Sequence, residues 1–97
     1  MRYVWDPAKD LLNQRKHRLS LKDGISALED PDRDFWVDDR FDYGEERIIT
    51  MGRRLKSLLV VVSTELISGP EGEEITRIIS VREAKKYELN WFYFGRP

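Results

Sequence analysis

The chain has no cysteine, and His17 is the single histidine among its 97 residues. Without cysteine there can be no disulfide and no thiolate ligand for a metal. One histidine does not supply the nitrogen ligands that zinc sites usually combine. We therefore expect a protein that works without a metal or any other cofactor.

Long apolar segments are absent as well. The longest run, Leu58 to Val62, is far shorter than the roughly 20 residues of a membrane span. Residues 1–6 lack the apolar core of a secretory signal. These features predict a soluble, cytoplasmic protein without membrane contact. With 40% hydrophobic and 36% charged residues, residues 1–97 suit a single domain with one core.

The formal net charge of −1 conceals an uneven distribution. Residues 23–46 hold ten acidic residues and two arginines, whereas the rest of the chain holds fifteen basic and eight acidic residues. A nucleic-acid ligand would require the basic excess to gather on one face, so we predict that the basic clusters and the acidic stretch lie on different faces. The alternative is a solvated acidic loop and a dispersed basic excess.

Two helices are expected near the N-terminus. Asp6-Pro7 is a helix start, with a capping carboxylate before proline at the first helical position. Apolar residues at helical spacing predict a buried face, and a polar stripe lies on the other side. The apolar face comprises Ala8, Leu11, Leu12 and the stem of Arg15; the polar stripe comprises Lys9, Asn13 and Lys16, bordered by His17. Ser20 and Asp23 form a capping box for a second, short helix, which Asp30-Pro31 ends.

An antiparallel sheet and a last helix follow. The expected strands are residues 35–37 (an edge), 47–51, 57–64 and 74–79, with a turn at 52–54. The strand over 57–64 is apolar on both faces, which predicts a central position. Ser80 to Glu83 reads as a capping box that opens the last helix. The aromatic tail, residues 91–97, either completes the core or remains exposed as a surface for a partner. The predicted fold class is therefore α+β.

Cationic side chains cluster at the ends of these elements, and no high-specificity enzyme motif accompanies them. Metal-free RNA cleavage needs a base for the 2′-OH proton, cations for the phosphorane and an acid for the leaving oxygen. Lys16 or His17 could move protons, and Arg47, Arg77 and Arg82 could supply charge.

Each of these residues also has a structural interpretation. His17 could be a partner of the helix dipole. Arg77, between isoleucines on a strand, could form a salt bridge with Glu46 or Glu65. For Arg53, Arg54 and Lys56 we favour a solvated hairpin.

Several motifs, taken in order along residues 5–88, resemble the BrnT family, small toxins of bacterial type II toxin–antitoxin pairs. They are Trp5-Asp6, Lys9, Asn13, Lys16-His17, Asp30-Pro31, Glu46-Arg47, Gly52, Leu58 to Val61, Thr64-Glu65 and Arg77 to Arg82.

The resemblance implies a RelE-like fold and an endoribonuclease that cuts RNA and stops translation and growth. It also implies a ribbon–helix–helix antitoxin that forms a hetero-oligomer with the toxin and carries the DNA binding. By position, the resemblance implies catalytic roles for Lys16, His17, Arg47, Arg77 and Arg82. We expect substrate binding by Lys9 and Glu46. We also include Arg53 and Arg54 as substrate-binding residues, although a solvated hairpin is the favoured structural interpretation for them.

The chain departs from the family pattern at two positions. Arg18 stands where the family has glycine, which costs about 1 kcal/mol if the helix ends in a left-handed residue. Leu66 stands where the family has arginine. The alternative function is therefore a degenerate toxin that binds its antitoxin and cuts nothing. Convergence of Lys16, His17, Arg77 and Arg82 on one open cleft would favour the enzyme.

Overall fold

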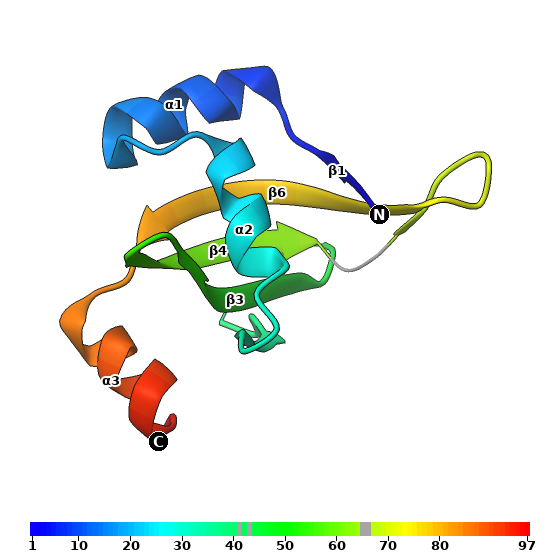
Figure 1. Cartoon of the computed structure of the whole chain (residues 1–97). Coiled ribbons are helices and arrows are strands. Elements are labelled where there is room, and N and C mark those ends of the chain that lie inside the picture. Colours follow the sequence, from blue (N-terminus) through cyan, green and yellow to red (C-terminus); the bar gives the residue numbers. More distant parts are fainter. Residues whose placement is uncertain (41, 43, 65–66) are drawn as a thin grey trace.

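In the computed structural model, which describes residues 1–40, 42, 44–64 and 67–97, the chain begins with a strand. Strand β1 (Arg2–Val4) pairs in parallel with β6 (Glu74–Glu83). The described residues form three α-helices and a mixed sheet of six strands, an α+β fold (Figure 1). The expectation of two helices before an antiparallel sheet is therefore wrong in its order and in its sheet. A strand of three residues shows too little alternation to be recognised.

Strand β4 (Ser57–Thr64) lies at the centre of the sheet, whose order is β1-β6-β4-β3-β2. Its neighbours are β6 and β3 (Arg47–Arg54); β2 (Asp34–Val37) is an edge, and β5 (Ile67–Ser68) pairs with β6. Leu59 and Val61 are buried in one core cluster, and Leu58 and Val60 in another. Because alternate residues of a strand face opposite sides, β4 is covered on both faces, as predicted.

The turn between β3 and β4 lies at Leu55, whose φ is 55°, and the predicted turn at residues 52–54 is wrong. Gly52 is a strand residue, and a Cβ atom there would lie 2.3 Å from the carbonyl oxygen of Ala27. The glycine permits this close approach of α2 (Gly24–Leu28) to β3.

Helix α1 (Pro7–His17) begins as predicted, because Asp6 Oδ1 accepts a hydrogen bond from the Ala8 N–H at 2.8 Å. It ends at His17, and the residue that follows, Arg18, is left-handed with φ 59°. The predicted buried face is wrong, since Leu11 and Leu12 are 58% and 61% exposed.

The buried residue of α1 is Asn13, which contacts the edge of β6. Its Nδ2 donates to the Val81 carbonyl at 2.9 Å, and its Oδ1 accepts from the Val81 N–H at 3.1 Å. β1 pairs with residues 75–77 of β6, so the edge of β6 further along carries backbone groups that need partners. The side of α1 that faces the sheet therefore needs a polar residue, and Asn13 supplies it.

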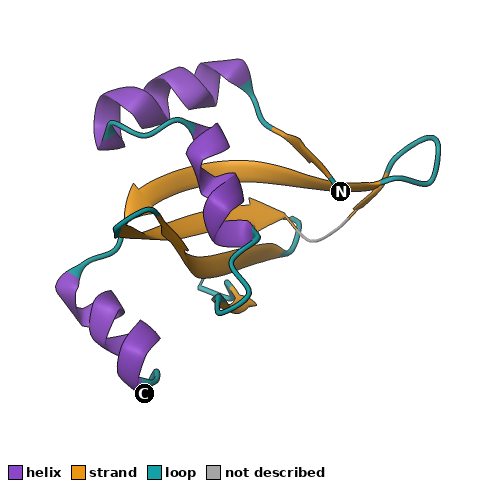
Figure 2. Cartoon of the chain, viewed as in Figure 1, coloured by secondary structure: helices purple, strands orange, loops and turns teal. Residues whose placement is uncertain are grey.

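The 3₁₀-helix η1 (Leu21–Asp23) and α2 follow, and the predicted capping box is confirmed. Ser20 N–H donates to Asp23 Oδ2 at 2.9 Å. Leu21 and Ala27 join Leu59, Val61 and two β6 residues in the first core cluster. Figure 2 shows α1 and α2 on one side of the strands, with α3 set apart from them.

Strand β6 contains a bulge that decides which side chains share a face. Val62 lies opposite Ser80, but the next residue, Ser63, lies opposite Ile78, so Ile79 is an extra residue. Arg77 and Arg82, five residues apart, would face opposite sides of a regular strand. The bulge places both on the face that carries Val60 and Val62. Ser80, which would face away from Arg77 on a regular strand, shares its face for the same reason.

Helix α3 (Lys86–Phe94) begins later than predicted, because β6 continues through the supposed capping box at Ser80 to Glu83. The capping carboxylate is Glu88, whose Oε1 accepts from the Lys85 N–H at 2.8 Å. The aromatic residues of the tail, Trp91 to Phe94, belong to this helix. Trp91 and Phe92 pack on the second core cluster, whereas Tyr93 and Phe94 are 60% and 85% exposed.

Candidate active site

A cleft of about 610 Å³ opens over the sheet face opposite α2. Its floor is apolar, one side is aromatic and its rim is charged. The described lining residues include Ile49, Val60 and Val62 (floor); Trp36, Tyr87 and Trp91 (aromatic wall); Lys16, His17, Arg40, Arg82 and Lys85 (cations and histidine); and Asp38, Asp39 and Glu88 (carboxylates). Three of the five predicted catalytic residues, Lys16, His17 and Arg82, therefore meet in one cleft.

His17 is the last residue of α1, one turn after the Asn13 that joins this helix to Val81. The anchor fixes the helix end beside the C-terminal part of β6. Burial lowers the pKa of His17 below its ordinary 6.5, and the positive charges of Lys16 and Arg82 lower it further. The imidazole is thus mainly neutral at pH 7, the form that can accept a proton.

Arg82 is held by a two-pronged ion pair with Glu88 of α3. Its Nη1 and Nη2 donate to the two Glu88 carboxylate oxygens at 2.7 and 2.8 Å. These hydrogen bonds raise the pKa of Arg82 above its ordinary value. Burial raises the pKa of Glu88, but the hydrogen bonds from Arg82 and Lys85 outweigh it and leave that pKa lowered. The pair fixes the guanidinium in the cleft and ties α3 to β6.

The predicted cations Arg47 and Arg77 lie on the same sheet face but are not among the described residues lining the cleft. Arg77 Nη2 donates to Glu45 Oε1 at 2.5 Å, and Arg47 Nε lies 3.6 Å from the same oxygen. The partner of Arg77 is thus Glu45 and not the predicted Glu46; the other predicted partner, Glu65, and Leu66 lie outside the described residues.

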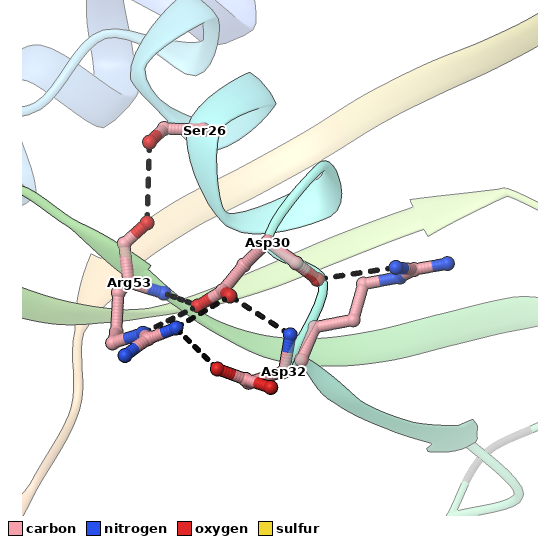
Figure 3. A network of polar contacts seen from close by, with 5 residues as sticks. Ser26, Asp30, Asp32 and Arg53 are labelled. Carbon is pink, nitrogen blue, oxygen red and sulfur yellow. Dashed lines mark hydrogen bonds and ion pairs between the residues drawn. The ribbon is translucent and has the colours of Figure 1, made fainter.

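The two residues predicted to bind substrate at the first hairpin, Arg53 and Arg54, form ion pairs with the acidic stretch. Figure 3 shows Arg53 against Asp30, with Nε and Nη2 donating to the two carboxylate oxygens at 2.9 and 3.0 Å. The Arg53 N–H also donates to Asp30, and Nη2 donates to Asp32. Arg54 pairs with Asp23. The hairpin is partly solvated, as favoured, since the Arg53 and Arg54 side chains are 47% and 36% exposed. Their ion pairs were not predicted.

The acidic stretch and the basic clusters are intermixed, so the prediction that they lie on different faces is wrong. Asp38 and Asp39 line the same cleft as Lys16 and Arg82. Asp38 is buried and accepts from Arg40 Nε and Nη2 at 2.8 and 3.0 Å. Carboxylates of residues 23–46 therefore neutralise part of the positive charge locally.

The remaining predicted substrate-binding residues, Lys9 and Glu46, lie beside the cleft. Lys9 shares an adjoining hollow of about 260 Å³ with Lys16 and His17. Glu46 is exposed in a shallow acidic hollow that also contains Asp38 and Asp39.

Glu88 and the aromatic wall are parts of the site that were not predicted from the sequence. A carboxylate three residues after Lys85 is a helix-start signal, but the capping-box pattern at Ser80 to Glu83 gives the same signal earlier in the chain. Nothing local could place Trp36 next to α3, because the two are brought together only by the sheet.

Among the described residues, no group of three or more His, Cys, Asp or Glu side chains could hold a metal ion. None of the helices in the described part of the chain is long and apolar enough to cross a membrane.

Comparison with known proteins gives one family. The family model described as the ribonuclease toxin, BrnT, of type II toxin–antitoxin systems matches residues 5–88. No curated protein matches the chain. The matched range contains α1, strands β2 to β6 and Glu88. It therefore includes both partners of the Arg82–Glu88 ion pair in the cleft. The chain therefore belongs to the BrnT family of ribonuclease toxins.

Proposed function

We propose that this toxin is a metal-independent endoribonuclease that cuts RNA in the cytoplasm and thereby stops translation and growth. The observation that carries the proposal is the meeting of Lys16, His17 and Arg82 in one open cleft. In-line attack by a 2′-OH requires a proton acceptor, a proton donor for the leaving oxygen and a cation held near the phosphate.

In the proposed reaction, neutral His17 removes the proton from the 2′-OH, whose oxygen attacks phosphorus. The bond from phosphorus to the 5′-oxygen breaks, which gives a 2′,3′-cyclic phosphate, and the 5′-oxygen takes a proton. Lys16 is the candidate acid, and Arg82 stabilises charge on the phosphorane oxygens. The lowered pKa of His17 supports its role as the base.

We propose that the other cations act on the RNA chain away from the reacting phosphate. Arg47 and Arg77 extend the charged face beyond the cleft, and Lys9 borders it. For Glu46 we propose a place at the rim. Arg53 and Arg54, whose guanidinium groups pair with Asp30 and Asp23, are proposed to stabilise the fold and not to bind substrate.

As a type II toxin, the protein has a cognate antitoxin. We propose that this antitoxin is of the ribbon–helix–helix type, forms a hetero-oligomer with the toxin and carries all contact with DNA. We propose further that residues 1–97 act as one domain with a RelE-like arrangement. The exposed Tyr93 and Phe94 are candidate antitoxin contacts.

The test is expression of the lone chain in bacteria, with and without its antitoxin, scored by growth and by RNA integrity. Purified toxin is then incubated with RNA in excess chelator. We expect growth arrest, RNA cleavage that persists in chelator, and loss of both with His17→Ala. Antitoxin binding without RNA cleavage would instead establish the binding-only alternative.

A further inference from the structure

The aromatic wall of the cleft has no part in the proton and charge chemistry described above. Trp36 comes from β2, and Tyr87 and Trp91 come from α3. Tyr87, 48% exposed, packs edge-on against Trp91, with ring centroids 4.9 Å apart and an angle of 73° between the ring planes. Tyr87 and Trp91 therefore present a fixed corner to the cleft.

Trp36 is fixed in a different way. The Arg96 guanidinium stands 4.1 Å from the centre of the Trp36 ring, and Arg96 Nε donates to Asp34 at 3.0 Å. A cation over an aromatic face is attracted to it, and the Asp34 contact holds that cation in place. The indole is therefore oriented before any ligand arrives, which lowers the ordering cost of binding.

Aromatic rings beside fixed cations are the combination that binds single-stranded nucleic acid, because bases stack on rings while phosphates pair with cations. Arg82, held by Glu88, is such a fixed cation, and the exposed Lys16 and Lys85 add positive charge in the same cleft. We propose that Trp36, Tyr87 and Trp91 form a base-binding subsite, which holds an unpaired RNA base next to the phosphate at His17. This inference rests on the proposed RNA cleavage and specifies its substrate as single-stranded.

The size of the cleft agrees with this assignment. Its volume of about 610 Å³ lies within the roughly 300–1,000 Å³ of cavities that hold drug-sized ligands, the size class of a nucleotide. Bases inside an RNA duplex are stacked and paired, so their faces cannot reach an aromatic wall. The subsite therefore selects unpaired segments.

Binding of a 2′-fluoro RNA oligonucleotide tests the subsite apart from catalysis, because this probe lacks the attacking hydroxyl. We expect Tyr87→Ala to weaken its binding roughly 10- to 100-fold, since stacking one base on an aromatic ring contributes about 1–3 kcal/mol. Tyr93→Ala is the matched control: it removes an exposed tyrosine from the same helix, outside the described lining of the cleft. It should leave the affinity unchanged.

A second arm uses the wild-type toxin and so does not depend on whether a variant folds. A fully paired duplex of the same sequence should bind at least 10-fold more weakly than the single strand. Equal binding of the duplex would overturn the proposal, and so would unchanged affinity in both Tyr87→Ala and Trp36→Leu. A selective loss of antitoxin binding in Tyr87→Ala, with RNA affinity intact, would assign the wall to the antitoxin and also overturn it.

The proposed function can fail separately. If RNA is not cleaved but the single strand still binds through Tyr87, the subsite stands and the ribonuclease mechanism falls. If RNA is cleaved and both the Tyr87→Ala and the Trp36→Leu variants bind the probe normally, the mechanism stands and the subsite falls.

Discussion

Two arginine–carboxylate pairs, at the junction of α2 with β3 and in the cleft, have nearly the same geometry and different surroundings. Arg53 and Arg82 each donate twice to a buried carboxylate, Asp30 and Glu88 respectively, at 2.7 to 3.0 Å. Asp30 also accepts from the backbone N–H groups of Asp32 and Arg53. Arg82, in contrast, borders a large open cleft beside His17.

The difference shows that pairing alone does not separate a structural arginine from a functional one. At the α2–β3 junction the ion pair ends a helix and joins it to a strand, so its donors and acceptors are used within the fold. In the cleft the pair orients a guanidinium toward space that a ligand can fill. Substitutions in the two regions should therefore affect different properties, namely stability and cleavage.

The largest effect is expected from His17 in the cleft. His17→Ala should lower the cleavage rate about 10²- to 10⁴-fold, the usual contribution of a general base, with little change in melting temperature. Because the base must be neutral and the pKa of His17 is lowered, the wild-type rate should rise with pH and level off with a midpoint below 6.5. A rate that falls across that range would assign His17 to the acid role.

Arg82→Ala should lower single-turnover cleavage about 10²- to 10³-fold, the loss seen when one transition-state donor is removed. The substitution also leaves Glu88 buried without its partner, so rates must be measured well below the melting temperature of the variant. Arg82→Lys keeps the charge but loses the two-pronged geometry. Its cleavage rate should lie between those of the wild type and Arg82→Ala. Full activity of a folded Arg82→Ala variant would show that the Arg82–Glu88 pair, like the Arg53–Asp30 pair, serves the fold and not cleavage.

At the α2–β3 junction the expected loss is in stability. Asp30→Ala should lower the free energy of unfolding by about 1–3 kcal/mol, because buried donors lose their acceptor. Cleavage by the folded variant should be unchanged. Asp32→Ala removes an exposed partner of the same arginine and should cost less than about 1 kcal/mol.

The contribution of Asp30 should also depend on pH. The side-chain hydrogen bonds from Arg53 hold the pKa of Asp30 well below its ordinary 3.8. A carboxylate with a lowered folded-state pKa stabilises the fold above its unfolded pKa and loses this contribution as pH falls. The stability difference between wild type and Asp30→Ala should therefore be full above about pH 4 and shrink in stronger acid.

Arg77 lies between the two cases, since it shares the cleft's sheet face but pairs with Glu45. Arg77→Ala should weaken RNA binding and cleavage about tenfold or less, because it loses a phosphate contact and not a transition-state donor. An effect of 100-fold or more on the chemical step alone would move Arg77 into the catalytic set. Thermal unfolding should change little, since an exposed pair contributes little.

The smallest effect is expected at Arg18. This residue has φ 59° at the end of α1, where glycine carries no steric penalty. Arg18→Gly should therefore raise the free energy of unfolding by up to about 1 kcal/mol, partly offset by the greater freedom of glycine in the unfolded chain. A loss of stability would show that the arginine side chain outweighs its backbone strain.

Local signals predicted the elements whose causes are local. The Asp6-Pro7 start, the Ser20–Asp23 capping box and the doubly buried β4 each follow from a few neighbouring residues. The edge strand β2 was also predicted. These features need only propensity, capping and alternation.

The failures come from contacts between distant residues. Asn13 looks like a surface residue until the edge of β6, 68 positions further along the chain, is placed against it. The pairing of β1 with β6 and of Arg53 with Asp30 also joins distant segments. For the site, the sequence supplied the residue types of the cleft but could not show which of the arginines meet there.

The single extra residue at Ile79 makes β6 sensitive to length in a way that substitutions would not reveal. Removing it would rotate residues 80–83 by half a turn relative to the start of the strand. Val81 would then point into the cleft, and Arg82 would enter the apolar layer beneath α2. The five-residue spacing of Arg77 and Arg82 therefore leaves both side chains on the cleft face only while the bulge is present.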